Sequence, residues 1–144
     1  MKLLFLGDVM GRAGRAAVTA RLPKLREDWK LDFVVVNGEN ATSGVGLSAD
    51  HAKAILAAGA DCITLGDHAF DQKDMLSFIE TEPRILRPLN YARTAPGKGA
   101  RVFTATNGRS RTPYSRYFAR IFSSSIATFD ARHSSPARAW KSIS

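Results

Sequence analysis

Three short polar segments of the sequence combine oxygen donors with glycines, and each follows an apolar run. The first contains Asp8, the second Glu39 and Asn40, and the third Asp67 and His68. Carboxylate and amide oxygens suit hard metal cations, and a histidine can bind a metal or act as a general acid. Two neighbouring cations can bind a phosphate, lower the pKa of a bridging water and stabilise a leaving oxygen. These residue types therefore predict a two-metal phosphoesterase site, with His68 as proton donor to the leaving group.

Each segment also has a simpler interpretation when it is taken alone. Asp8 can cap a following helix, and Glu39 and Asn40 can belong to a polar turn. A single histidine such as His68 is often structural, and Asp71 fits a helix cap better than a metal ligand. The combination is more specific, because an acid, an acid–amide pair and an acid–histidine pair follow three successive predicted strands.

The apolar patterns predict the elements that position these residues. Strands are expected at three short apolar runs, at residues 2–6, 33–36 and 62–65. Two weaker strand candidates cover residues 85–86 and 101–106. Three helices are expected between the strands, from about Arg12, from Ala49 to about Ala58 after the cap Ser48, and after a cap at Asp71.

Two of these helices carry more specific expectations. Pro23 falls inside the first helix and is expected to kink it or to end its first half. In the third helix, the apolar residues Met75, Leu76 and Ile79 are expected to face inward.

The alternation of strands and helices predicts an α/β fold with a mainly parallel sheet. Right-handed crossovers place the carboxyl ends of the strands at one edge of the sheet, where such folds bind ligands. The residues that end the first three strands, Asp8, Asn37 and Gly66, are therefore expected to lie side by side at that edge.

The bulk composition favours a soluble globular protein with a basic tail. The chain has 144 residues, a size that suits one domain, and a net charge of +8. Residues 1–108 hold 14 basic and 12 acidic residues, whereas residues 109–144 hold 7 basic residues and one acid. The apolar start is too short for an export signal or a membrane span. The single cysteine, Cys62, excludes an intrachain disulfide and is expected to be a buried, inert thiol, which is consistent with a cytoplasmic protein.

The motifs closely resemble those of the YmdB-like group of calcineurin-like metallophosphoesterases. The similar segments run in order over residues 1 to about 108, at residues 4–15, 36–41, 64–71, 87–91 and 96–99. The resemblance implies an α/β/β/α sandwich, of which residues 1–108 would form the amino-terminal half. It also implies a centre of two divalent or trivalent metal ions, with iron expected and manganese as the alternative. The implied reaction is hydrolysis of phosphodiesters, with 2′,3′-cyclic nucleotides as the substrate class.

The resemblance also implies a role for each candidate residue. Asp8 would bind the first metal, Glu39 would bridge both metals, Asn40 and Asp67 would bind the second, and His68 would be the proton donor. The family usually has asparagine at the position of Asp67. An aspartate can still bind a metal, but it adds negative charge and can alter the metal preference.

The resemblance is weaker towards the end of the sequence. The remaining ligands of the family are histidines in Gly-His and His-Thr-His motifs, whereas this sequence has only His51, His68 and His133. His51 is expected on a helix surface, and His133 lacks the motif context. The distal metal ligands are therefore expected to be missing, and residues 109–144, rich in serine and arginine, are interpreted as a frameshifted or disordered tail.

Three functions remain open from the sequence. The first is a metal-dependent phosphodiesterase, whose activity in this chain is in question because the ligand set is incomplete. The second is a non-catalytic remnant with at most weak metal binding. The third is a nucleic-acid-binding module formed by the cations and aromatic residues of the tail, namely Arg111, Tyr114, Arg116, Tyr117, Phe118 and Arg120. The third is disfavoured, because charge alone gives mostly non-specific affinity, and no membrane partner is expected.

Overall fold

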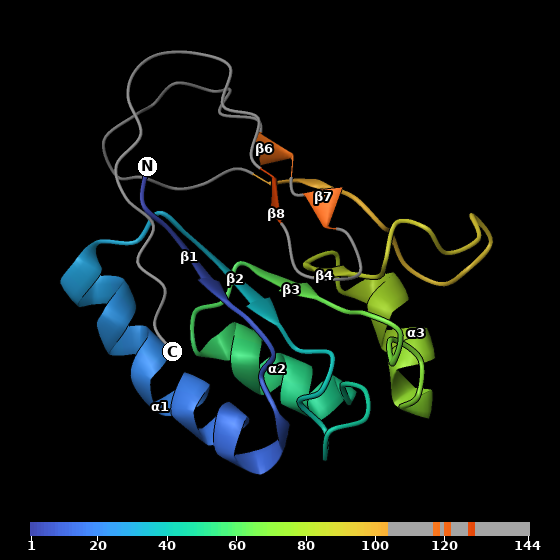
Figure 1. The fold of residues 1–144 in the computed structure, drawn as a ribbon, viewed down its shortest axis with the longest axis horizontal. Helices are drawn as coiled ribbons and strands as arrows, with labels where there is room; N and C mark the ends of the chain where they lie inside the picture. The colour runs from blue at the N-terminus through green and yellow to red at the C-terminus, as the bar shows by residue number, and fades with distance from the viewer. Residues whose placement is uncertain (104–116, 119, 122–126, 129–144) are drawn as a thin grey trace.

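A parallel sheet of four strands forms the centre of the fold, with the strands in the order β1-β2-β3-β4. The computed structural model describes residues 1–103, 117–118, 120–121 and 127–128 (Figure 1). The sheet strands are β1 (Leu3–Leu6), β2 (Phe33–Asn37), β3 (Cys62–Thr64) and β4 (Ile85–Leu86). The helices between them are α1 (Gly11–Trp29), α2 (Ala49–Ala57) and α3 (Lys73–Thr81). The predicted α/β fold with a parallel sheet is therefore confirmed.

Two short antiparallel strand pairs lie later in the chain. Strand β5 (Val102–Phe103) pairs with β6 (Tyr117–Phe118), and β7 (Arg120–Ile121) pairs with β8 (Ala127–Thr128). Strand β5 falls inside the weaker candidate at residues 101–106. Within the described residues, no helix is both long enough and apolar enough to cross a membrane.

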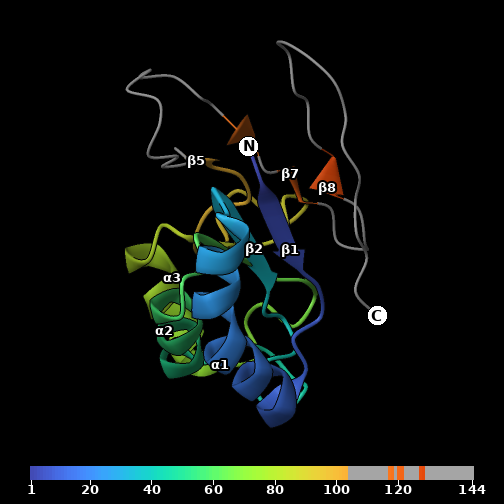
Figure 2. The ribbon, with the colours of Figure 1, turned by 90° about the vertical axis from the view of Figure 1, so that its left-hand side faces the viewer.

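All three helices lie on one face of the parallel sheet, as the two ribbon views show (Figures 1 and 2). Leu22 of α1, Ile55 of α2 and Met75 of α3 are fully buried and belong to one cluster with Val34 and Val36 of β2. Phe33 and Val35 of β2 are also buried, but they belong to a second, smaller cluster. Because both faces of β2 are covered, its sequence is continuously apolar rather than alternating.

The first helix continues past Pro23. It runs from Gly11 to Trp29, so the predicted end at Pro23 was wrong, whereas the alternative of a kink there stays a prediction. A proline inside a helix costs about 3 kcal/mol, because a backbone hydrogen bond is lost and the ring clashes with the preceding turn. Val18 and Leu22 before Pro23 are buried in the main core, and this packing offsets the cost.

The other two helices confirm one cap and correct another. Ser48 caps α2, since its Oγ accepts from the backbone N–H of His51 at 3.4 Å. In contrast, Asp71 does not cap α3: Gln72 occupies the cap position and makes no side-chain cap bond. Met75 and Ile79, which lie one turn apart, face inward as predicted. The prediction for Leu76 was wrong: it is 42% exposed, because it points away from that face of the helix.

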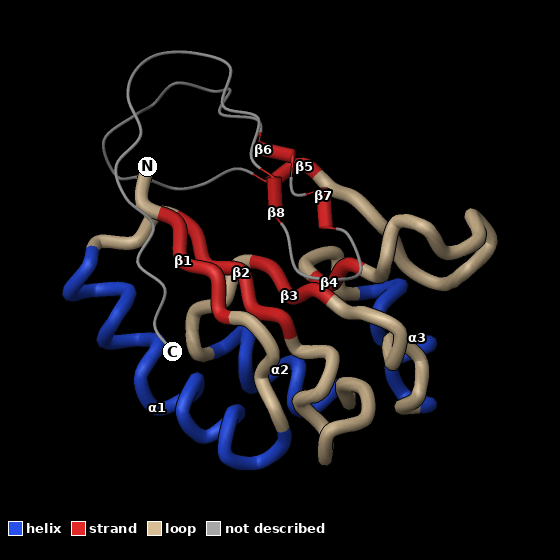
Figure 3. The backbone as a smooth tube through the Cα atoms, in the orientation of Figure 1, coloured by secondary structure: helices blue, strands red, loops and turns tan. Residues whose placement is uncertain are grey.

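The carboxyl ends of β1, β2 and β3 meet at one edge of the sheet, and the loops that follow them leave from it (Figure 3). Hydrogen bonds of the ladder continue past the strands: Val9 N donates to Asn37 O and Gly38 N to Thr64 O, each at 3.0 Å. The predicted convergence of three polar loops at this edge is therefore confirmed.

Candidate metal centre

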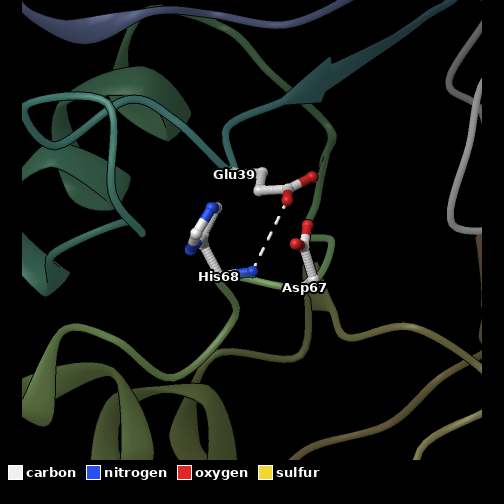
Figure 4. A group of neighbouring side chains, drawn as sticks. All are labelled: Glu39, Asp67 and His68. Atoms are coloured by element: carbon white, nitrogen blue, oxygen red, sulfur yellow. Dashed lines mark hydrogen bonds between the residues drawn. The ribbon is translucent and has the colours of Figure 1, made fainter.

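Three of the predicted side chains form a cluster at this edge. One donor atom from each of Glu39, Asp67 and His68 lies within 4.8 Å of the other two (Figure 4). Glu39 comes from the loop after β2, whereas Asp67 and His68 come from the loop after β3. The two carboxylates point towards each other, as Figure 4 shows. Two carboxylates and an imidazole that converge in this way match the donors that divalent transition metals use in proteins.

Gly66 makes room for Glu39. A Cβ atom on Gly66 would overlap the Glu39 carboxylate, so only glycine leaves the carboxylate in its observed place. The backbone N–H of His68 also donates to Glu39 Oε1, at a long 3.5 Å. The Gly-Asp-His segment therefore supplies two members of the cluster and the space for the third.

The two carboxylates influence each other's ionisation. Partial burial raises the pKa of Glu39, and a hydrogen bond with Asp67 raises it further. The same bond lowers the pKa of the more exposed Asp67. Besides burial, the negative charge of Asp67 disfavours ionisation of Glu39, because like charges repel each other. A cation in the cluster would offset this repulsion.

Asp8 and Asn40 form a second pair beside the cluster. Asn40 Nδ2 donates to Asp8 Oδ1 at 2.8 Å, and the backbone N–H of Gly11 donates to the Asn40 carbonyl at 2.9 Å. Asp8 has a positive φ of 45°, which turns the chain sharply between β1 and α1. The cluster of three does not include Asp8, and Asn40 offers a donor rather than its amide oxygen to Asp8. The loops thus bring all five predicted residues to one edge, as a cluster of three and a neighbouring pair.

Asp71 has a role that the sequence did not reveal. Its Oδ2 lies 2.7 Å from His68 Nδ1, so it bonds the histidine instead of capping α3. This bond is the main reason why the pKa of His68 is raised, because a carboxylate stabilises the protonated imidazole. With Nδ1 engaged, Nε2 is the nitrogen that can meet a ligand or a leaving group. The three-residue spacing between histidine and acid is the signal that could have indicated this contact.

Tyr91 contacts the backbone of the loop that follows β3. Its hydroxyl lies 3.2 Å from the carbonyl oxygen of Gly66 and 3.0 Å from that of Asp67, within donating distance of both. Its ring packs against Phe70, with ring centroids 5.7 Å apart. Burial raises the pKa of the Tyr91 hydroxyl, and the nearby carboxylates add to the effect. Tyr91 therefore holds the backbone that carries two members of the cluster.

His51 is not the surface residue that the sequence predicted. It is half-buried, and its Nδ1 lies 2.7 Å from Thr42 Oγ1, which also accepts from the backbone N–H of Ser48 at 2.8 Å. Burial lowers the pKa of His51. His51 therefore ties the loop after β2 to the start of α2.

Other predicted features lie in the core or outside the described residues. Cys62 is fully buried as predicted, and burial raises the pKa of its thiol to about 12. His133 lies outside the described residues. Of the tail residues considered for nucleic-acid binding, only Tyr117, Phe118 and Arg120 belong to described strands.

Comparison with protein families and known proteins gives one consistent result. The model of a family described as YmdB-like protein matches residues 4–130. A 2′,3′-cyclic-nucleotide 2′-phosphodiesterase of Bacillus subtilis is 40% identical over 109 residues, which are 76% of this chain and 41% of that protein. A putative phosphatase/phosphodiesterase of Mycoplasma genitalium is 38% identical over 108 residues, 72% of this chain and 38% of the relative.

Solved structures agree with these relatives. A hypothetical protein from Thermus thermophilus superposes with a TM-score of 0.68 and 41% identity, over 73% of this chain and 40% of that one. A phosphatase from Mycoplasma pneumoniae gives a TM-score of 0.67 and 38% identity, over 74% of this chain and 39% of that one. The chain thus spans about two fifths of the length of the proteins it matches.

Proposed function

Because this chain belongs to the YmdB-like protein family, we propose that it carries metal-binding loops of a phosphodiesterase that acts on 2′,3′-cyclic nucleotides or related phosphodiesters. The name of the Bacillus subtilis relative supports this substrate class. The observation that carries the proposal is the convergence of Glu39, Asp67 and His68 within 4.8 Å of one another. Carboxylate oxygens and an imidazole nitrogen this close together can bind one metal ion jointly.

We propose that Glu39 and Asp67 bind metal directly and that Asp8 and Asn40 complete the ligand set in this part of the chain. The fit is supported by the two carboxylates that point towards each other, since a cation between them would offset their repulsion. Iron is the proposed metal and manganese the alternative. When bound, two such ions supply a polarised phosphate and a hydroxide nucleophile.

The remaining steps of the proposed mechanism use side chains of this chain. His68 Nε2 donates a proton to the leaving alkoxide, while Asp71 holds Nδ1 and favours the protonated ring. Tyr91 holds the backbone of Gly66 and Asp67 in position next to Glu39. Asp71 and Tyr91 are therefore positioning residues in this proposal, and His68 is the catalytic residue.

The test measures metal binding and hydrolysis on the same preparation. The chain is stripped with a chelator, and Mn²⁺ binding is followed by calorimetry before bis-p-nitrophenyl phosphate and 2′,3′-cyclic AMP are offered as substrates. Glu39→Gln should weaken Mn²⁺ binding and remove any metal-dependent hydrolysis. Asp50→Asn is the matched control, because Asp50 is 91% exposed on α2 and pairs only with Lys53 among the described residues.

The possible results separate the two leading functions. Metal-dependent hydrolysis that His68→Ala abolishes supports the phosphodiesterase. Mn²⁺ binding without hydrolysis supports the non-catalytic alternative, and equal binding by the wild-type chain and Glu39→Gln refutes the metal centre itself.

A further inference from the structure

Arg87 is a buried cation at the edge of the sheet that carries the metal centre. It directly follows β4 and is only 6% exposed. Arginine is almost never buried to this extent unless a partner neutralises it, because taking an unpaired charge out of water is costly. The surroundings of its guanidinium group therefore need an explanation.

The guanidinium group of Arg87 is only partly satisfied. Nη1 donates to the carbonyl oxygen of Pro88 at 3.0 Å, whereas Nε is buried and has no hydrogen-bond partner. Ion pairs of other arginines are present, such as Arg26 with Asp61 and Arg84 with Glu82. In the part of the chain that the structure describes, no carboxylate forms an ion pair with Arg87.

Arg87 lies next to the third loop of the metal centre. Strand β4 pairs with β3 in parallel, with Leu86 opposite Thr64, and Leu65 N donates to Leu86 O at 2.9 Å. The segment that begins at Arg87 therefore lies beside the loop that follows β3 and carries Asp67. Four residues later in the same segment, the Tyr91 hydroxyl reaches the Asp67 carbonyl.

The loop around Gly99 leaves space for the guanidinium group and adds a second cation. A Cβ atom on Gly99 would lie 2.7 Å from Leu89 Cα and 3.2 Å from Arg87 Nη1, so a side chain there would crowd the site. The backbone N–H of Arg87 donates to the carbonyl of Lys98 at 3.0 Å, and Lys98 itself is exposed. Gly99 therefore leaves room for the guanidinium group, and Lys98 adds an exposed cation to the same loop.

We propose that Arg87 binds a phosphate-type oxyanion at the carboxyl end of β4. The planar guanidinium fork matches two phosphate oxygens, and a charge-assisted hydrogen bond would satisfy its unpartnered nitrogen. The identity of this anion as the phosphoryl group of a substrate rests on the proposed function, whereas the binding of phosphate by Arg87 does not.

The test uses the full chain without metal, so that a metal ion cannot hold the anion. Inorganic phosphate is titrated into the chelator-treated protein in chloride buffer, and binding is followed by calorimetry and by the melting temperature. Arg87→Met keeps the length of the side chain and removes the charge, and it should lower phosphate affinity about tenfold or more. Arg93→Met is the matched control, because Arg93 is exposed in the same segment and carries the same charge.

The melting temperature without phosphate gives a second, independent result. If the Arg87 charge is unpaired in the chain, Arg87→Met should melt at the same temperature as wild type or higher, because a costly buried charge has been removed. Phosphate should raise the melting temperature of wild type and of Arg93→Met but not of Arg87→Met.

Three results would overturn the proposal. They are the absence of phosphate binding by wild type, equal loss of binding in the Arg87 and Arg93 variants, and an Arg87→Met variant that melts far below wild type or does not fold. The last result would mean that the chain itself already neutralises Arg87. Absence of metal-dependent hydrolysis alongside Arg87-dependent phosphate binding would refute the proposed function and leave this inference standing.

Discussion

The substitution Gly66→Ala should separate metal binding from folding. The added Cβ would overlap the Glu39 carboxylate, which must leave the cluster. The obstacle is the far end of a flexible side chain, so the strain is limited to about 0.5–1.5 kcal/mol for an off-rotamer Glu39. The backbone of Gly66 does not adopt a positive φ, so alanine is compatible with it.

The expected change in stability is close to zero. Replacing glycine by alanine at a compatible position stabilises a protein by roughly 0.4–1 kcal/mol, because the unfolded chain loses freedom. This gain and the strain on Glu39 are similar in size and opposite in sign. The melting temperature of Gly66→Ala should therefore stay within a few degrees of wild type.

Metal binding should change much more. Substitutions that disturb a residue supporting a metal ligand typically lower metal affinity about 10–100-fold, and Gly66→Ala displaces the ligand itself. Calorimetry with Mn²⁺ measures the loss. Gly7→Ala is the matched control: Gly7 also ends a strand before an aspartate, but its Cβ would meet only the Phe5 ring, at 3.3 Å. If Gly66→Ala binds Mn²⁺ as tightly as Gly7→Ala does, Glu39 is not a ligand in the observed position.

Four further predictions follow from named contacts. Asp71→Asn should lower the pKa of His68, because the carboxylate that raises it is lost. An NMR titration that gives His68 the same pKa in the variant and in wild type would refute the contact. Tyr91→Phe should cost about 0.5–1.5 kcal/mol in chemical denaturation, since the hydrogen bonding of its hydroxyl to two loop carbonyls is lost. His51→Gln should flatten the pH dependence of stability: a lowered pKa means that the His51 contribution is present above about pH 6.5 and lost as pH falls below it. Mn²⁺ affinity, measured by calorimetry at several pH values, should fall as pH falls, because the raised pKa of Glu39 lets protons compete with the metal, and Glu39→Gln should weaken that pH dependence.

Parallel topology is the feature that made the site predictable from the sequence. The short, β-branched and continuously apolar run Phe33–Val36 favoured a strand covered on both faces, and such strands are typical of parallel sheets. Once the strands are parallel, their carboxyl ends must share an edge, whatever the details of the loops. That geometry brings the loops of Asp8, Glu39 and Asp67 to one edge, but it does not decide which side chains meet there: Asp8 pairs with Asn40 outside the cluster.

The residues that the sequence misplaced are polar groups whose partners lie in another turn or element. Local preference assigned Asp71 to a helix cap, but the turn before α3 brings it back to His68. His51 was assigned to a helix surface, but its partner Thr42 comes from the preceding loop. The His68–Asp71 spacing was a local signal that the capping rule outweighed, whereas the Thr42–His51 contact spans nine residues and depends on the folded loop.

The fold holds the carboxylates of Glu39 and Asp67 close together although their like charges repel each other. Two carboxylates that face each other repel, and an unstrained loop would let them separate. Here the empty space at Gly66 admits the Glu39 side chain, and Tyr91 holds the carbonyls of the opposite loop. A cation bound between the two carboxylates would relieve the repulsion. If the site binds metal as proposed, these contacts keep its ligands together before the ion arrives, so changes at Gly66 or Tyr91 should affect metal binding more than folding.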